Sequence, residues 1–174
     1  MGIIILWLYI LYFIIIKPSL CVGFFRSRVM QARKCIACLN GILWSEDMRK
    51  VRKLNVYNAL IKSSLLYGSE TWRLTENDKR RVEATEMDVL RRSSRISRKE
   101  RIRNVTIREQ IGLEEPIIKE IEQNRLTWHG HVQRMEEGRL PKIALKWMAK
   151  QKKARGRPKK NWMEGVRKAM NERT

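Results

Sequence analysis

The side chains that could do chemistry in this 174-residue chain are few and widely spaced. Cys35 and Cys38 have the spacing of half a zinc site, and His129 and His131 could supply two more ligands. Neither pair has a partner at the spacing of a metal finger. The preferred interpretation is that the two cysteines are small apolar residues on a helix face, and we predict no metal site.

The acidic residues form no catalytic pattern. Phosphoryl-transfer and nuclease reactions need carboxylates that hold metal ions about 4 Å apart. The three aspartates, Asp47, Asp78 and Asp88, belong to no paired acidic motif, and they are better explained as helix caps or surface charge. The chain also lacks a glycine-rich phosphate loop, an HExxH motif and a nucleophile elbow. A cysteine nucleophile with a histidine base is not favoured, so we predict no catalytic residue and no cofactor.

The basic residues are far more informative. Lys and Arg number 38 against 18 acids, which gives a net charge of +20 and a sequence pI near 10.5. This charge favours RNA or DNA as the partner, with an anionic membrane surface second. The excess falls in several clusters, as a long track of phosphates would require, at residues 26–34, 49–53, 91–103 and 142–160.

The densest basic stretch contains RGRPKK at residues 155–160. Glycine permits close approach of the backbone, and proline keeps the chain extended, so Arg155 and Arg157 could lie along a narrow minor groove in A/T-rich DNA. This motif resembles an AT-hook. The alternative is an unspecific phosphate-binding or nuclear-import segment.

Two of these clusters supply the candidate nucleic-acid-binding residues. The first follows the third predicted helix as a solvated basic strip, and the second is the arm that begins at residue 150. The arm also favours a nuclear location. The candidates are Arg91, Arg92, Arg95, Arg98, Lys99, Arg101, Lys150, Lys152, Lys153, Arg155, Arg157, Lys159 and Lys160.

Apolar residues recur at spacings of three and four along most of the chain, and no alternating strand pattern occurs. The sequence therefore predicts an all-α fold, a small helical domain with a basic C-terminal arm and an apolar N-terminal segment. We divide it into an apolar leader at residues 1–25, a helical region at 28–149, and the arm with a short terminal helix at 150–174.

Local signals place the helix ends. Asn40-Gly41 is expected to stop a first helix whose apolar set is Val29, Ala32, Ile36 and Leu39. Ser45 is expected to cap a second helix that runs to about Leu66. Thr75 should cap a third helix, with Val82, Thr85 and Val89 inward. In the second helix the predicted inward residues are Val51, Leu54, Leu60, Ile61 and Leu65, and in the long helix from residue 117 they are Ile117, Ile121, Trp128, Val132 and Met135.

Residues 3–16 are fourteen consecutive apolar side chains, and apolar character resumes after Lys17-Pro18 as far as residue 25. A membrane-spanning helix needs about 20 such residues. If residues 3–25 insert, the basic residues that follow would keep the rest of the chain in the cytoplasm, as a signal anchor does. The alternatives are that the segment is an unrelated leader fused to the body, or an aggregation-prone end.

Seven motifs, in this order, resemble the region downstream of the polymerase palm in non-LTR (LINE-type) retrotransposon reverse transcriptases. They cover about residues 28–166. The motifs are LNGILWS (39–45), LLYGSETW (65–72), EMDVLRR (86–92), RIRN (101–104), RLTWHGHVQRM (125–135), RLPKIALKW (139–147) and RGRPKKNW (155–162).

The resemblance implies a helical thumb and C-terminal extension from an element whose polyprotein carries an endonuclease and a reverse transcriptase. The catalytic motifs of both enzymes lie upstream of the matched region in that family, and neither occurs here. We therefore expect a nonenzymatic fragment that binds RNA or DNA. A thumb normally packs on a palm, so self-association or a missing palm is also expected. The alternative function is a membrane-anchored cytoplasmic helical protein whose basic surface faces anionic lipid.

Overall fold

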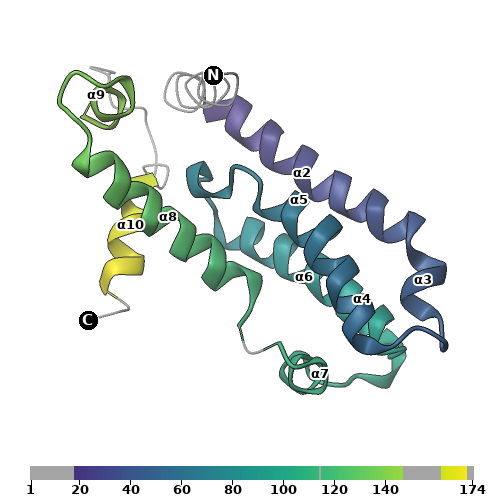
Figure 1. Ribbon diagram of the computed structural model, residues 1–174. Coiled ribbons are helices and arrows are strands. Elements are labelled where there is room, and N and C mark those ends of the chain that lie inside the picture. The colour runs from purple at the N-terminus through teal and green to yellow at the C-terminus, as the bar shows by residue number, and fades with distance from the viewer. Residues whose placement is uncertain (1–17, 114, 147–161, 172–174) are drawn as a thin grey trace.

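The computed structural model describes residues 18–113, 115–146 and 162–171, and every regular element in these ranges is a helix (Figure 1). The predicted all-α fold is confirmed. The four long helices are α2 (Pro18–Cys38), α6 (Glu76–Ser93), α8 (Ile117–Arg134) and α10 (Trp162–Asn171). The short ones are α3 (Asn40–Trp44), α4 (Lys50–Val56), the π-helix η1 (Tyr57–Lys62), α5 (Ser63–Leu66), the 3-10 helices η2 (Ser69–Thr71) and η3 (Arg98–Glu100), α7 (Asn104–Ile111) and α9 (Leu140–Lys146).

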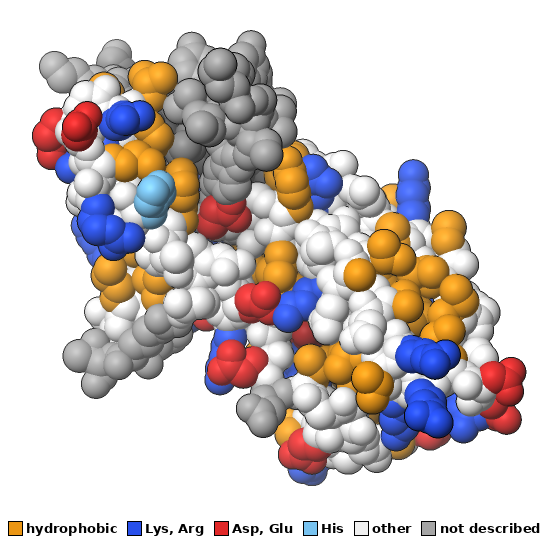
Figure 2. Space-filling model, in the orientation of Figure 1, with side chains coloured by type: hydrophobic (Ala, Val, Ile, Leu, Met, Phe, Trp, Pro, Cys, Tyr) orange, Lys and Arg blue, Asp and Glu red, His pale blue; other side chains and the backbone are white. Residues whose placement is uncertain are grey.

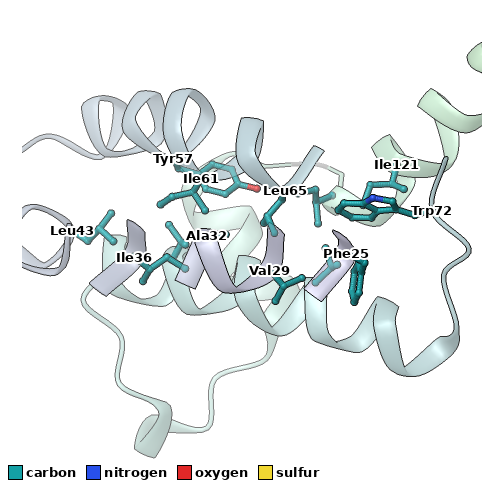
Figure 3. Packing of buried hydrophobic residues seen from close by; sticks show 13 residues of the cluster. Phe25, Val29, Ala32, Ile36, Leu43, Tyr57, Ile61, Leu65, Trp72 and Ile121 are labelled. Atoms are coloured by element: carbon teal, nitrogen blue, oxygen red, sulfur yellow. The ribbon is translucent and has the colours of Figure 1, made fainter. Parts of the chain in front are cut away.

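The main hydrophobic core lies where α2, the η1–α5 segment and α6 pack side by side (Figures 1 and 3). Of the set predicted for the first helix, Leu39 is half-buried just after α2, whereas Val29, Ala32 and Ile36 are buried in this core. Its buried members are Phe25, Val29, Ala32, Ile36, Leu43, Tyr57, Ile61, Leu65, Trp72, Val82, Val89, Ile117 and Ile121. A smaller cluster of Met87, Leu90, Ile96 and Ile107 joins α6 to α7.

The prediction that Asn40-Gly41 ends the first helix is wrong in detail. The chain turns at Leu39, and Asn40 and Gly41 begin α3. Glycine inside a helix costs about 1 kcal/mol. Burial of a leucine contributes roughly 1.5 to 3 kcal/mol, and Leu43 in the same short helix is fully buried, so the packing outweighs the local stop signal.

The second predicted helix forms, but its start and its buried face differ from the prediction. Ser45 is the C-cap of α3, and α4 begins only at Lys50. The middle of the helix is a π-helix, whose turns are wider than those of an α-helix. Residues four apart therefore stay on one face, and Val51 and Leu60 are exposed instead of buried. The buried residues are Lys53, Tyr57, Ile61 and Leu65.

The predicted start of α6 is confirmed in detail. The Thr75 side chain accepts a hydrogen bond from the Asp78 backbone, and the Asp78 carboxylate accepts one from the Thr75 backbone, which makes a capping box. Val82, Thr85 and Val89 are buried as predicted. This helix is therefore the most accurately predicted element.

The inward face of α8 differs from the prediction at its centre. Ile117, Ile121 and Val132 are buried, whereas Trp128 is only half-buried. The buried positions near it belong instead to Arg125 and His129, because α10 packs there on α8. The Arg125 guanidinium donates to the Trp72 carbonyl (3.3 Å), and burial lowers the pKa of Arg125.

The last helix, α10, is held by a close approach and one hydrogen bond. A Cβ at Gly165 would collide with the Arg125 guanidinium, so a larger residue here would require that side chain to move. The Trp162 indole donates to the Glu70 carbonyl at 2.9 Å. The helix that follows the basic arm thus belongs to the packed body.

A buried carboxylate joins four segments. Glu86 of α6 accepts from Arg108 of α7 (2.7 Å), from the Tyr57 hydroxyl of η1 (3.3 Å) and from the Ile117 backbone at the start of α8 (3.0 Å). Burial, followed by the Glu86 charge, raises the pKa of Tyr57. Neutral Tyr57 is therefore the form that fits the core.

Within the part of the chain that the structure describes, no helix combines the length and apolar character needed to span a bilayer. The apolar run at residues 3–16 lies outside the described residues.

Candidate nucleic-acid interface

The structure places six of the thirteen predicted nucleic-acid-binding residues. They lie on what we call the basic corner, residues 91–103, which comprises the end of α6, the following turn, η3 and the start of the link to α7. This stretch contains seven Lys or Arg and one acid, Glu100. The other seven residues, in the arm, lie outside the described residues, between α9 and α10: Lys150, Lys152, Lys153, Arg155, Arg157, Lys159 and Lys160.

Two of the six placed residues make hydrogen bonds or ion pairs within the protein, so the prediction of a solvated basic strip is wrong for these two. Arg91 donates to the Ile102 carbonyl (2.7 Å) and to Asn104 (3.2 Å), which closes the turn between α6 and α7. Arg92 pairs with Asp88 (3.1 Å) and also donates to Asn40 of α3. Both side chains are half-buried, and each is tied to another element, Arg91 to the start of α7 and Arg92 to α3.

Two more of the six carry surface ion pairs. Arg95, which has a positive φ of 58°, pairs with Glu46 in the loop after α3. Arg98 pairs with Asp88 at 3.0 Å. Exposed pairs of this kind contribute little stability, so both guanidinium groups remain accessible to an anion.

Lys99, Arg101 and Arg103 are the open cations of the basic corner. All three side chains are exposed, and none has an acidic partner among the residues that the structure describes. Arg101 adopts a left-handed backbone conformation (φ 52°) directly after η3, which turns the chain between Lys99 and Arg103. Three unpaired positive charges on a turned backbone are suited to contact phosphates.

Lys53 supports the basic corner from inside. Its ammonium donates to the Ser45 carbonyl after α3 (2.7 Å) and to the Ser93 carbonyl at the end of α6 (3.4 Å). Burial, followed by the nearby Arg95 charge, lowers the pKa of Lys53. A single buried cation therefore links the ends of two helices, and it was not predicted because a hydrophobic pattern assigns lysine to the surface.

The structure adds a second basic area that sequence reasoning noted only as a cluster. α2 packs along α6, and the Arg33 side chain donates to Thr85 at 3.3 Å. Arg81 lies one turn before Thr85, and its carbonyl accepts the Thr85 hydroxyl. The Arg33 side chain therefore reaches the turn of α6 that begins at Arg81, 48 positions later in the sequence.

The described residues offer little for metal-dependent chemistry. Within residues 18–113, 115–146 and 162–171, no group of three or more His, Cys, Asp or Glu side chains could hold a metal ion. Asp78 caps α6, and Asp88 forms ion pairs with Arg92 and Arg98. The half-buried Cys35 packs against the main core, as the preferred interpretation predicted, whereas Cys38 is exposed.

Comparison with known proteins gives one relative. No protein-family model and no solved structure matches the chain. A transposon-derived protein of Caenorhabditis elegans, described as uncharacterized, is 27% identical over 149 residues, which cover 81% of this chain. The chain spans 53% of that relative's length. The chain is therefore similar over most of its length to a transposon-derived protein.

Proposed function

We propose that this protein is a nucleic-acid-binding product of a non-LTR retrotransposon, derived from the helical region that follows the reverse-transcriptase palm. The transposon-derived relative supports the origin, and the seven ordered motifs support the finer assignment. The protein acts without a catalytic site of its own, by contact with the backbone of RNA or DNA. Its basic composition favours a nuclear localisation.

The observation that carries this proposal is the basic corner. Five of its cations are exposed, and contacts made by Arg91, Arg92 and Lys53 fix its backbone to α3, α4 and α7. Rigid positioning reduces the entropy lost when phosphates bind. The corner therefore offers a preorganised anchor, and the arm supplies further charge.

The first experiment removes the open cations of the basic corner. A variant with Lys99→Gln, Arg101→Asn and Arg103→Gln is expected to bind 20-nucleotide duplexes more weakly, and the slope of log affinity against log salt should fall by about two to three units. Asparagine is chosen at position 101 because it tolerates the left-handed conformation. Affinity would be measured by fluorescence anisotropy over a range of salt concentrations.

The control variant removes the same charge elsewhere, at the exposed Lys119, Arg134 and Arg167 of α8 and α10. It should change the slope less. If both variants lower the slope equally, binding is not centred on the basic corner. If the unaltered protein fails to bind either RNA or DNA at low salt, the proposed function is wrong.

A second experiment addresses the arm. Arg157→Ala is expected to reduce the preference for A/T-rich over G/C-rich duplex, because the hook interpretation places this side chain in the minor groove. Lys152→Ala should weaken binding to both duplexes about equally, since a phosphate contact carries no base information. Competition binding at fixed salt would compare them. If neither substitution changes the preference, the arm is a generic polycation.

The alternative proposal is a membrane-anchored helical protein, and it depends on the fourteen apolar residues at positions 3–16. Resistance of the full chain to carbonate extraction from membranes would favour it. The basic corner would then face anionic lipid.

A further inference from the structure

The end of α3 exposes an aromatic ring beside the basic corner. Trp44 is the last residue of α3, and its side chain is 38% exposed. Leu43, the residue before it, is fully buried in the main core. Since successive residues of a helix point about 100° apart, anchoring Leu43 turns Trp44 toward the surface.

Contacts on both sides of Trp44 fix it to the end of α6. Asn40 accepts a hydrogen bond from Arg92, the Ser45 carbonyl accepts from Lys53, and Glu46 pairs with Arg95. The start of α3 and the residues just after Trp44 are therefore tied to the basic corner, which carries the proposed phosphate contacts. A backbone held in this way has less freedom to lose when a ligand binds.

The surroundings of Trp44 combine apolar surface with positive charge. Ile42 and Val51 are exposed large apolar residues on α3 and α4, and Arg49, Lys50 and Arg52 are exposed cations of the next segment. Figure 2 shows hydrophobic side chains over the α3 and α4 end of the molecule, with Lys and Arg side chains along their lower edge. The described structure also places the acids Glu46 and Asp47 here, and Arg95 neutralises the first of them.

We propose that Trp44 is a stacking platform for an unpaired base, so that this corner binds single-stranded nucleic acid in preference to duplex. The inference rests on the proposed function and adds its substrate class. Proteins that bind single strands combine a cationic surface for the backbone with aromatic rings on which bases stack. The bases of a duplex are already stacked on one another, so their faces are not available to stack on an exposed indole ring.

The variant Trp44→Ala is expected to weaken binding of a 20-nucleotide oligo(dT) or oligo(U) about tenfold, within the range measured for loss of one stacked base. Binding of a 20-base-pair duplex at the same salt should change less than twofold. Trp44→Phe keeps an aromatic face and should retain most of the single-strand affinity. Val51→Ala serves as the control, because it removes exposed apolar surface nearby without removing a ring.

The measurement is competition binding with the full chain, and thermal unfolding would confirm that each variant is folded. A selective loss for the single strand that Trp44→Phe largely restores supports the platform. Equal losses for both nucleic acids, or no loss for the single strand, overturn the platform while leaving the proposed function intact; the exposed indole is then a contact for another protein. If the unaltered protein binds neither nucleic acid, the proposed function fails, and the platform fails with it.

Discussion

Replacement of Trp72 by alanine is expected to lower the free energy of unfolding by about 3 to 5 kcal/mol, because truncation of a large buried aromatic residue removes its packing and leaves a cavity. The Trp72 side chain is 1% exposed. It lies between α2 and α8, with the Phe25 ring edge-on to it at 5.1 Å between centroids and Ile121 beside it (Figure 3). A loss of this size is a large part of the stability of a small domain.

Urea denaturation followed by circular dichroism would measure the change, with Trp44→Ala as the matched control at an exposed tryptophan. Trp72→Phe should cost much less than Trp72→Ala. Phenylalanine fills most of the site and also removes an indole N–H that is buried without a hydrogen-bond partner in the described structure. A cost below about 1 kcal/mol for Trp72→Ala would mean that the contact among α2, η2 and α8 does not stabilise the domain.

The position of Trp72 illustrates what the sequence could not predict. Periodic apolar spacing correctly identified the inner faces of α2 and α6, because those residues are apolar and lie on regular helices. Trp72 follows a 3-10 turn with extended backbone, where no helical period applies. Its burial depends on Phe25, which lies 47 positions earlier in the sequence, and only the packed structure brings the two together.

Buried polar residues escaped prediction for a related reason. Lys53, Glu86 and Arg125 are each at least 96% buried, although a hydrophobic pattern assigns such residues to the surface. Each is tolerated because it meets a partner from another element, and a single sequence does not identify that partner.

Part of the candidate interface could be predicted, because its signal does not depend on partners from distant parts of the sequence. Clustered charge is a local property of the sequence, so the basic corner could be located without a structure. The sequence could not show in the same way which of these cations lack an acidic partner. The acceptors of Arg92 include Asn40, 52 positions away. The position of Trp44 beside the basic corner likewise follows only from the packing of α3 against α6.

Glu86→Ala is expected to destabilise the protein by about 3 to 5 kcal/mol, because it removes the buried partner of Arg108 and leaves that charge only its longer 3.5 Å contact with the more exposed Glu83. Arg108, Tyr57 and the Ile117 backbone would all lose an acceptor. As the control, Tyr57→Phe removes only one donor from the same carboxylate and should cost about 1 to 2 kcal/mol. Denaturant unfolding near neutral pH would compare the two.

A double-mutant cycle separates the ion pair from simple loss of volume. Glu86→Leu and Arg108→Met each strand one charge, whereas the combined variant removes both. The combined cost should therefore fall short of the sum of the single costs by about 1 to 3 kcal/mol, the range found for groups in one network. The 2.7 Å contact between Arg108 and Glu86 predicts this coupling directly. Additive costs would show that Arg108 is sufficiently hydrated in solution to do without Glu86, and the junction of α6, α7 and α8 would then depend on its apolar contacts alone.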